Sequence, residues 1–179
     1  MHFTPKQAEV LAAICRLQES GSDDITLERL GREIAESASG PGGKKAPKQL
    51  NPSHVSRIIA GIKDREKVLV KKIHNRKVSI FLNPNAIATT GLVARILLDL
   101  DQATRSDHVR TDEFRKSELE AKWFKASGKD ESYMDRVLNW CLLEGVGYAY
   151  VAKESPDFIG ATDRVSEERD YLDLIAVPK

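Results

Sequence analysis

The sequence has few cysteines and no long apolar run. Only Cys15 and Cys141 occur in the 179 residues, and two such distant cysteines do not make a disulfide framework. No segment reaches the roughly 18 to 20 apolar residues of a membrane-spanning helix. The opening MHFTPKQAEV lacks the basic and apolar stretches of a secretory signal. We therefore expect a soluble cytoplasmic protein, without membrane contact, whose two thiols are buried and reduced.

The sequence also lacks the motifs that position catalytic groups. It contains no Walker loop, no Gly-x-Gly-x-x-Gly, no His-Glu-x-x-His and no Gly-x-Ser-x-Gly. The GPGGKK segment at 40–45 has neither the Walker spacing nor its Ser/Thr nor a preceding strand. The histidines are scattered along the chain, which argues against a metal site. These absences predict a protein that is not an enzyme and needs no cofactor or metal.

Charge is nearly balanced over the whole chain, at +1, but unevenly distributed. Residues 1–85 hold 15 Lys and Arg against 9 Asp and Glu, a net +6, whereas residues 86–179 hold 13 against 18, a net −5. Within 44–77 there are 11 basic residues and only two acidic ones, Asp64 and Glu66. Because clustered positive charge attracts polyanions, segment 44–77 is the candidate electrostatic footprint of nucleic acid.

Two helices are predicted at the start of the chain. Thr4 can cap the first, Pro5 suits its first helical position, and Gln7 stands where a capping box requires it. Thr26 can cap a second helix that ends near Glu36. Apolar residues recur in both segments at helical spacing, so each helix has one face to bury.

A loop, a third helix and a hairpin are predicted next. The stretch 37–50 is rich in Gly, Pro, Ser and Lys and predicts a mobile basic loop that is neither helix nor strand. Asn51 and Pro52 begin the third helix, and strands follow at 68–73 and 77–82. His74, Asn75 and Arg76 link these strands, Asn83-Pro84 ends the second, and Asp24-Ile25 can add a short strand. The order of elements is that of a winged helix.

The second half repeats this order without repeating the sequence. We expect helices at 90–102, 111–126 and 132–144, strands at 146–153 and 170–178, and a long polar tip at 154–169. The fold class is therefore mainly helical with small β-hairpins (α+β), with a domain at 1–88 and a second winged-helix-like domain at 89–179.

The acidic second domain is a poor match for phosphate. Its third helix is expected to expose Asp135, Arg136, Asn139 and Glu144, and its tip to expose Arg164 and Arg169 among Asp163, Glu167, Glu168 and Asp170. Protein contact, including dimerisation, is the favoured role, and a second DNA contact is the alternative. Trp123, Phe124, Trp140 and Tyr148 suit either an interface or, more commonly, a core.

The third helix carries the candidate site. With Val55, Ile59 and Ile62 buried, helical geometry exposes Ser53, His54, Ser56, Arg57, Ala60 and Lys63. Short hydrogen-bonding groups near the N-terminus and cations further along suit a helix that enters the major groove. Arg57 can bond a guanine edge through two hydrogen bonds, and Ser53, His54 and Ser56 can reach bases or phosphates. Cations for phosphates come from the hairpin, at Lys71, Lys72, Arg76 and Lys77, which we expect to face the same way as the third helix. Others come from the loop, at Lys44, Lys45 and Lys48.

The string SHVSRIIAGIKDREKVLVKK resembles the recognition helix and wing of MarR-like winged helix-turn-helix proteins. The matching positions are Ser53, Val55, Ser56, Arg57, Ile59, Ile62 and Leu69. The closing LNPNAI is also similar to small plasmid replication initiators, and the resemblance covers about residues 4–88. Lys67 departs from the pattern, which usually has Gly at that turn, and the loop before the third helix is unusually long.

The resemblance and the charge pattern together imply sequence-specific binding of double-stranded DNA. Transcriptional regulation by a homodimer is the leading expectation, because two-fold pairing doubles the few base pairs that one short helix reads. Initiation of plasmid or phage replication is the second reading. The third is a winged-helix adaptor that binds proteins and not DNA.

Overall fold

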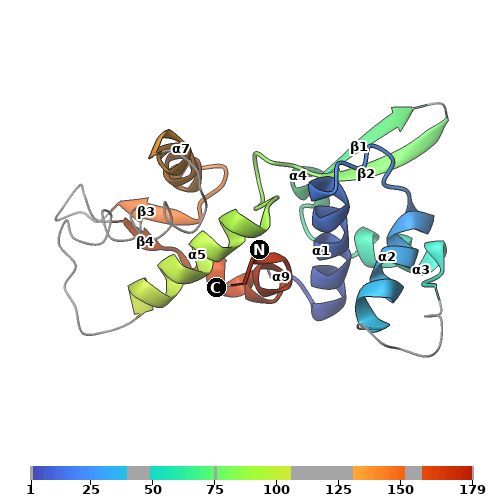
Figure 1. Ribbon diagram of the computed structural model, residues 1–179, viewed down its shortest axis with the longest axis horizontal. Coiled ribbons are helices and arrows are strands. Elements are labelled where there is room, and N and C mark those ends of the chain that lie inside the picture. Colours follow the sequence, from blue (N-terminus) through green and yellow to red (C-terminus); the bar gives the residue numbers. More distant parts are fainter. Residues whose placement is uncertain (1, 40–48, 75, 106–130, 152–158, 179) are drawn as a thin grey trace. The chain divides into compact units, whose positions relative to one another are not determined.

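The protein is described here from a computed structural model. The structure describes residues 2–39, 49–74, 76–105, 131–151 and 159–178. The chain divides into two compact units, one spanning Phe3–Thr90 and the other Gly91–Lys179. Each unit is mainly helical and holds one two-stranded antiparallel sheet (Figure 1). The expected fold class, mainly helical with small β-hairpins, is confirmed. Among the described residues, no helix combines the length and the apolarity that crossing a membrane requires.

The first unit contains three helices, a short fourth helix and a hairpin. The elements are α1 (Pro5–Glu19), α2 (Leu27–Ser39), α3 (Pro52–Ala60), α4 (Arg65–Val68), β1 (Leu69–His74) and β2 (Lys77–Leu82). At the start of α1, Thr4 Oγ1 accepts a hydrogen bond from the Gln7 amide at 3.4 Å, and Gln7 Oε1 accepts one from the Thr4 amide at 2.9 Å. The predicted capping box is therefore confirmed.

The second helix is longer than predicted. Thr26 caps it as expected, because its Oγ1 accepts a hydrogen bond from the Arg29 amide at 3.3 Å. The helix then continues to Ser39, so the expectation that segment 37–50 is loop throughout was wrong for its first three residues. Arg16 of α1 supplies the reason, since it donates hydrogen bonds to Glu33 and to Ser37, both at 2.8 Å. This contact between helices extends α2 by one turn.

The first strand of the hairpin is shifted by one residue from the prediction. His74 pairs with Lys77, so β1 continues one residue further than predicted, and Arg76 before β2 has a left-handed backbone with φ 64°. Val68, predicted as a strand residue, ends α4 instead. No strand forms at Asp24-Ile25 in the described structure, although the Ile25 carbonyl accepts a hydrogen bond from the Ile80 amide at 2.9 Å.

The turn before the hairpin also differs from the MarR-like pattern that the sequence resembles. Lys67 stands where that pattern has Gly, but Lys67 lies in α4. The residue with left-handed backbone is Asp64, with φ 51°. Aspartate tolerates this conformation better than most residues. After β2, Asn83 ends the strand as predicted, since its side-chain amide donates to the Lys67 carbonyl at 2.7 Å.

The first unit folds around α1. Its largest fully buried side chains are Leu11, Ile14, Ile25, Leu30, Leu82 and Ile87. These come from α1, α2, the end of β2 and the segments beside them, so this core joins α1, α2 and the hairpin. Val55 and Ile59 turn one side of α3 into this core, and the opposite side of α3 faces solvent.

In the described part of the second unit, two predicted helices are present and the second strand differs from the prediction. Its elements are α5 (Gly91–Arg105), α7 (Glu131–Leu142), β3 (Ala149–Val151), β4 (Ile159–Ala161), α8 (Asp163–Glu167) and α9 (Arg169–Ile175). The helices predicted at 90–102 and 132–144 are present. The helix predicted at 111–126, with Trp123 and Phe124, lies outside the described residues. The strand predicted at 170–178 was wrong, and the second strand falls in the predicted polar tip.

The error at 170–178 has a physical cause. Tyr171, Leu172 and Ile175 are buried, at the spacing of one face of a helix, while Leu174 is 47% exposed. This face packs against α5. A short apolar run fits either secondary structure, and here the packing partner favours the helix.

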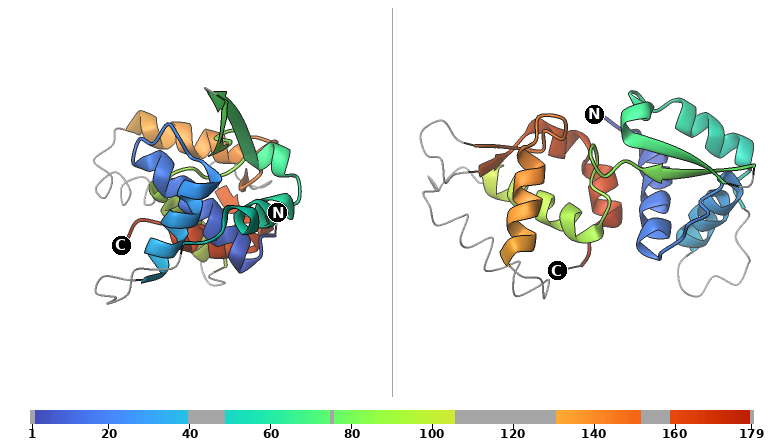
Figure 2. Two further views of the ribbon diagram at one scale, coloured as in Figure 1. Left: turned by 90° about the vertical axis from the view of Figure 1, so that its right-hand side faces the viewer. Right: turned by 90° about the horizontal axis from the view of Figure 1, so that it is seen from above.

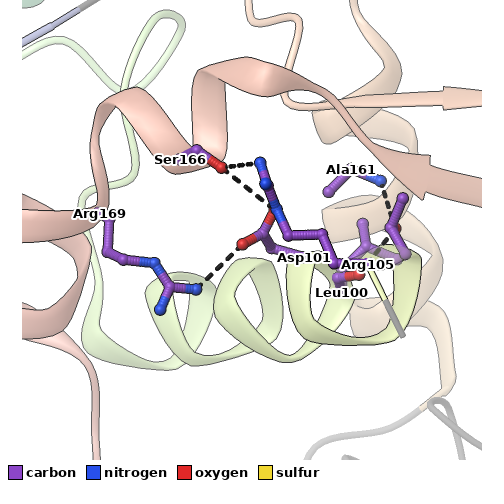
Figure 3. A network of polar contacts seen from close by, with 7 residues as sticks. Leu100, Asp101, Arg105, Ala161, Ser166 and Arg169 are labelled. Atoms are coloured by element: carbon purple, nitrogen blue, oxygen red, sulfur yellow. Dashed lines mark hydrogen bonds and ion pairs between the residues drawn. The ribbon is translucent and has the colours of Figure 1, made fainter. Parts of the chain in front are cut away.

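A buried aspartate at the end of α5 and two half-exposed arginines link this helix to α8 and α9 (Figure 3). Asp101 is 2% exposed and accepts hydrogen bonds from Arg105 at 2.8 Å and Arg169 at 3.0 Å. Arg105 also donates to Ser166. Because a buried carboxylate is costly unless it is paired, these two arginines offset the cost of burying Asp101.

A second buried carboxylate, Glu168, lies in the segment that was predicted to be a polar tip. Glu168 is 1% exposed, pairs with Arg164 Nε at 2.7 Å and accepts a hydrogen bond from the Tyr148 hydroxyl. Burial raises the pKa of Glu168, against the opposing effects of Arg164 and Tyr148. Tyr148 is fully buried, so it is a core residue and not an interface residue. Arg164 and Glu168 thus stabilise the unit internally.

Both cysteines are expected to resist thiol reagents in the folded protein. Cys15 and Cys141 are free and buried, and burial raises the pKa of Cys141 to about 12. Since the thiolate is the reactive form, neither should react with Ellman's reagent at pH 8 until the protein is unfolded in guanidinium, when both should. Rapid reaction of either thiol under native conditions would contradict this packing.

Candidate nucleic-acid interface

The exposed side of α3 presents the residues predicted for it. Ser53, His54, Ser56, Arg57 and Ala60 are exposed, as is Lys63 just beyond the helix. Successive residues of a helix rotate by about 100°, which places Ser53, Arg57 and Ala60 along the middle of this face and His54 and Ser56 on opposite flanks. Ile58 is only partly buried and lies beside the His54 flank.

The Ser53 hydroxyl takes part in the cap of α3, which limits the hydrogen bonds that it can offer a ligand. The Asn51 side-chain oxygen accepts hydrogen bonds from the Ser53 amide at 2.9 Å and from the Ser53 hydroxyl at 2.8 Å. The proton of the hydroxyl is therefore committed to the helix cap, and its lone pairs remain to accept. Arg57 is the large donor at the middle of the face, with five N–H groups in a planar fork.

Both ends of α3 are fixed to other helices. Before it, Gln49 Nε2 donates to the Glu28 carbonyl at 3.1 Å, and the Leu50 amide donates to the Gly31 carbonyl at 3.1 Å. After it, Gln7 Nε2 donates to the Gly61 carbonyl at 2.9 Å, so the capping-box residue of α1 also holds the end of α3. These contacts fix the position of α3 relative to α1 and α2.

The close approach at Gly31 yields a test. A Cβ on residue 31 would lie 2.2 Å from the Leu50 carbonyl oxygen, a contact that backbone must move to relieve. We expect Gly31→Ala to lower the free energy of unfolding by about 1–3 kcal/mol in urea titrations. The matched control is Gly61→Ala, where the nearest atoms would lie 3.5 Å away, and we expect a change within about 0.5 kcal/mol. Equal stability of the two variants would mean that residue 50 does not pack on α2.

The cations of the hairpin do not all share one face. In antiparallel strands, directly paired residues lie on the same face and successive residues alternate. Lys71 pairs with Ile80, whereas Lys72 pairs with Ser79 and lies on the face of Lys77. The prediction that these cations face one way was therefore wrong for Lys71. Lys72 Nζ also lies 4.7 Å from the centre of the Phe81 ring, which holds the ammonium over this face.

An open hollow connects the hairpin to the start of α3. It is lined by Asp24, Thr26, Leu27, Glu28, Arg29, Arg32, Pro52, Lys77 and Val78. The free end of the hairpin lies on the same side of α1 as α2 and α3 (Figures 1 and 2). Lys77 and the N-terminus of α3 therefore border one concave surface.

The hollow also brings in two cations that the sequence reasoning missed. Arg29 and Arg32 lie on the first turns of α2, and both are exposed. Arg29 donates to the Asp24 carbonyl at 3.2 Å, and Arg32 Nη2 lies 3.8 Å from Glu28 Oε1. Only their spacing in the sequence indicated that Arg29 and Arg32 lie together, since residues three apart at the start of a helix share a face.

Three of the predicted cations, Lys44, Lys45 and Lys48, lie outside the described residues. Arg76 and Lys77 are exposed at the hairpin end, as predicted.

The second unit has no comparable cationic surface in its described part. Its hollow along α5 is lined by Arg95, Asp99, Asp101, Arg105, Arg169 and Asp173, together with Leu98 and Gln102. Three arginines face three aspartates there, so the charges cancel. On α7, Arg136 and Asn139 are exposed as predicted, as is Glu144 just beyond it. No group of three or more metal-binding side chains occurs among the described residues of either unit.

Searches of protein-family models, curated proteins and solved structures find no significant match to the chain. Its function must therefore be inferred from the residues and geometry described above.

Proposed function

We propose that the first unit binds double-stranded DNA, with α3 in the major groove and the hairpin against the neighbouring backbone. Three helices followed by an antiparallel hairpin make the arrangement of a winged helix-turn-helix. The major groove is about 12 Å wide and admits one helix with its side chains. In this docking, the side of α3 opposite Val55 and Ile59 meets the bases.

The observation that carries the proposal is the exposed face of α3, with Arg57 at its middle and both ends held by other helices. Arg57 reads a guanine through two hydrogen bonds, and His54 and Ser56 contact the groove edges or phosphates on either flank.

The charge distribution supports the same docking, with α3 in the major groove and the hairpin against the backbone. The sequence contains no Asp or Glu from residue 67 to residue 98, and this stretch includes the whole hairpin. Lys72, Arg76 and Lys77, with Arg29 and Arg32 beside the hollow, supply about five phosphate contacts. Phosphate contacts hold the protein in register, and base contacts give it sequence preference.

The biological role proposed is transcriptional regulation by a homodimer, acting without cofactor and without catalysis. Two recognition helices related by two-fold symmetry would read half-sites about one helical turn apart. Initiation of plasmid or phage replication is the alternative, and the two differ in whether the preferred site lies at a promoter or in repeats at an origin. An adaptor function would require that the chain bind no DNA.

The test is selection of bound duplexes from a random pool by the full chain. The proposal predicts enrichment of a short motif, repeated as an inverted pair if the protein acts as a dimer. Recovery of duplexes without any enriched motif would leave only non-specific binding. Failure to retain any duplex would favour the adaptor.

A further inference from the structure

The end of the hairpin exposes an apolar pair. Ile73 is 77% exposed and Val78 is 45% exposed. The two residues are directly paired across the strands, so their side chains lie together on one face of the hairpin. Toward the base of the hairpin on the same face, Ile80 and Leu82 are buried. The apolar face therefore extends beyond the core that it covers.

Cations border this pair. Lys71 is exposed on the same face, one pair nearer the base, and Lys77 is exposed on the opposite face. Arg76 is exposed in the turn, and the hairpin has no acidic residue. Val78 and Lys77 also line the hollow that contains Pro52 at the start of α3. An apolar contact ringed by positive charge, next to the helix that we place in the major groove, is complementary to a polyanion that offers an apolar surface. The stacked bases of DNA, reached between two phosphate backbones, are such a surface.

We propose that Ile73 and Val78 form a wedge that enters the minor groove, partly separates one base step and bends the duplex. This inference rests on the proposed function. Proteins that press apolar side chains into the minor groove unstack a base step and kink the DNA by roughly 20–90°. Arg76 and Lys77 hold the phosphates on either side, and the bend brings more of the backbone to the cations of α2.

The wedge gives a role to Ile73 and Val78, two exposed apolar residues that add little to the stability of the fold. At 77% exposure Ile73 gains little from burial, and an exposed apolar strand end invites association with other chains. Flexible pyrimidine–purine steps are the easiest to unstack, so the wedge also gives a preference for such a step beside the motif read by α3.

The experiment measures DNA bending and affinity separately. The full chain is bound to a duplex of the selected sequence that carries fluorophores at both ends, and energy transfer reports the bend while anisotropy reports affinity. We expect wild type to bend the duplex by at least about 20°. Ile73→Ser with Val78→Ser should remove most of the bend. Val70→Ser is the matched control, since Val70 is 37% exposed on the opposite face of β1, and it should bend DNA as wild type does.

The outcomes separate this inference from the function that it rests on. If wild type binds DNA but leaves it straight, or if the double variant bends it equally, the wedge is wrong and the binding proposal stands. If no variant binds duplex DNA, the proposed function fails as well. Sedimentation gives a further check: a wild-type dimer that the double variant converts to monomer would assign the pair to a contact between two copies, and would overturn the wedge. Circular dichroism confirms that each variant folds.

Discussion

Arg57→Ala is expected to weaken binding to the selected duplex by about 1–3 kcal/mol, roughly 5- to 150-fold. Arg57 lies at the middle of the exposed face of α3, where its guanidinium can donate two hydrogen bonds to one guanine. Losing both bonds removes discrimination at one base pair. The variant should therefore bind all four bases about equally at that position and keep its preference at the others.

Arg65→Ala is the matched control, because Arg65 is an exposed arginine of the same unit that lies on α4 and not on α3. We expect it to leave the sequence preference unchanged. Equal weakening of Arg57→Ala on every duplex would make Arg57 a phosphate contact, and would require another residue of α3 to read the bases.

Reversing two charges on one face of the hairpin is expected to have the larger effect on binding to unrelated sequences. Lys72 and Lys77 lie on the same face of the hairpin, and Lys77 also lines the hollow beside α3. Each phosphate contact adds about 0.9 to the slope of log affinity against log salt. Lys72→Glu with Lys77→Glu should weaken binding to every duplex at low salt and reduce the slope by about 2.

Arg65→Glu serves as the control for net charge, because Arg65 is an exposed cation of the same unit that lies on α4 and not on the hairpin. It should weaken binding less than either substitution in the pair. If it weakens binding as much as Lys72→Glu does, the effect is one of overall charge, and the hairpin has no defined contact face.

The sequence predicted the first unit well because its signals are local. The Thr4–Gln7 capping box and the Asn51-Pro52 start of α3 require only residues within one turn of each other. The buried and exposed sides of α3 also follow from the helical repeat. These features fixed the candidate residues of α3 before any tertiary contact was considered.

The remaining features depend on contacts that the sequence does not reveal. The hydrogen bond from Arg16 to Ser37 extends α2. Packing against α5 favours a helix over a strand for the apolar run that begins at Tyr171. Arg164 and Glu168 looked like surface charges because nothing local indicates that they pair beneath Tyr148. In each case a partner distant in the sequence decided the outcome.

The hairpin shows how a small shift changes a functional prediction. β1 ends one residue later than predicted, and pairing of His74 with Lys77 fixes which side chains share a face. In a strand, neighbouring residues always alternate, so Lys71 and Lys72 could not both follow one row of phosphates. That same register brings Ile73 and Val78 together at the exposed end.

Fluorescence anisotropy of the full chain with a random-sequence duplex, repeated over a range of salt concentrations, tests the central claim most directly. With about five phosphate contacts, we expect micromolar affinity at low salt and a log–log slope near −4.5. Undetectable binding at low salt, or an affinity that does not change with salt, would contradict the assignment of this protein as a DNA-binding protein.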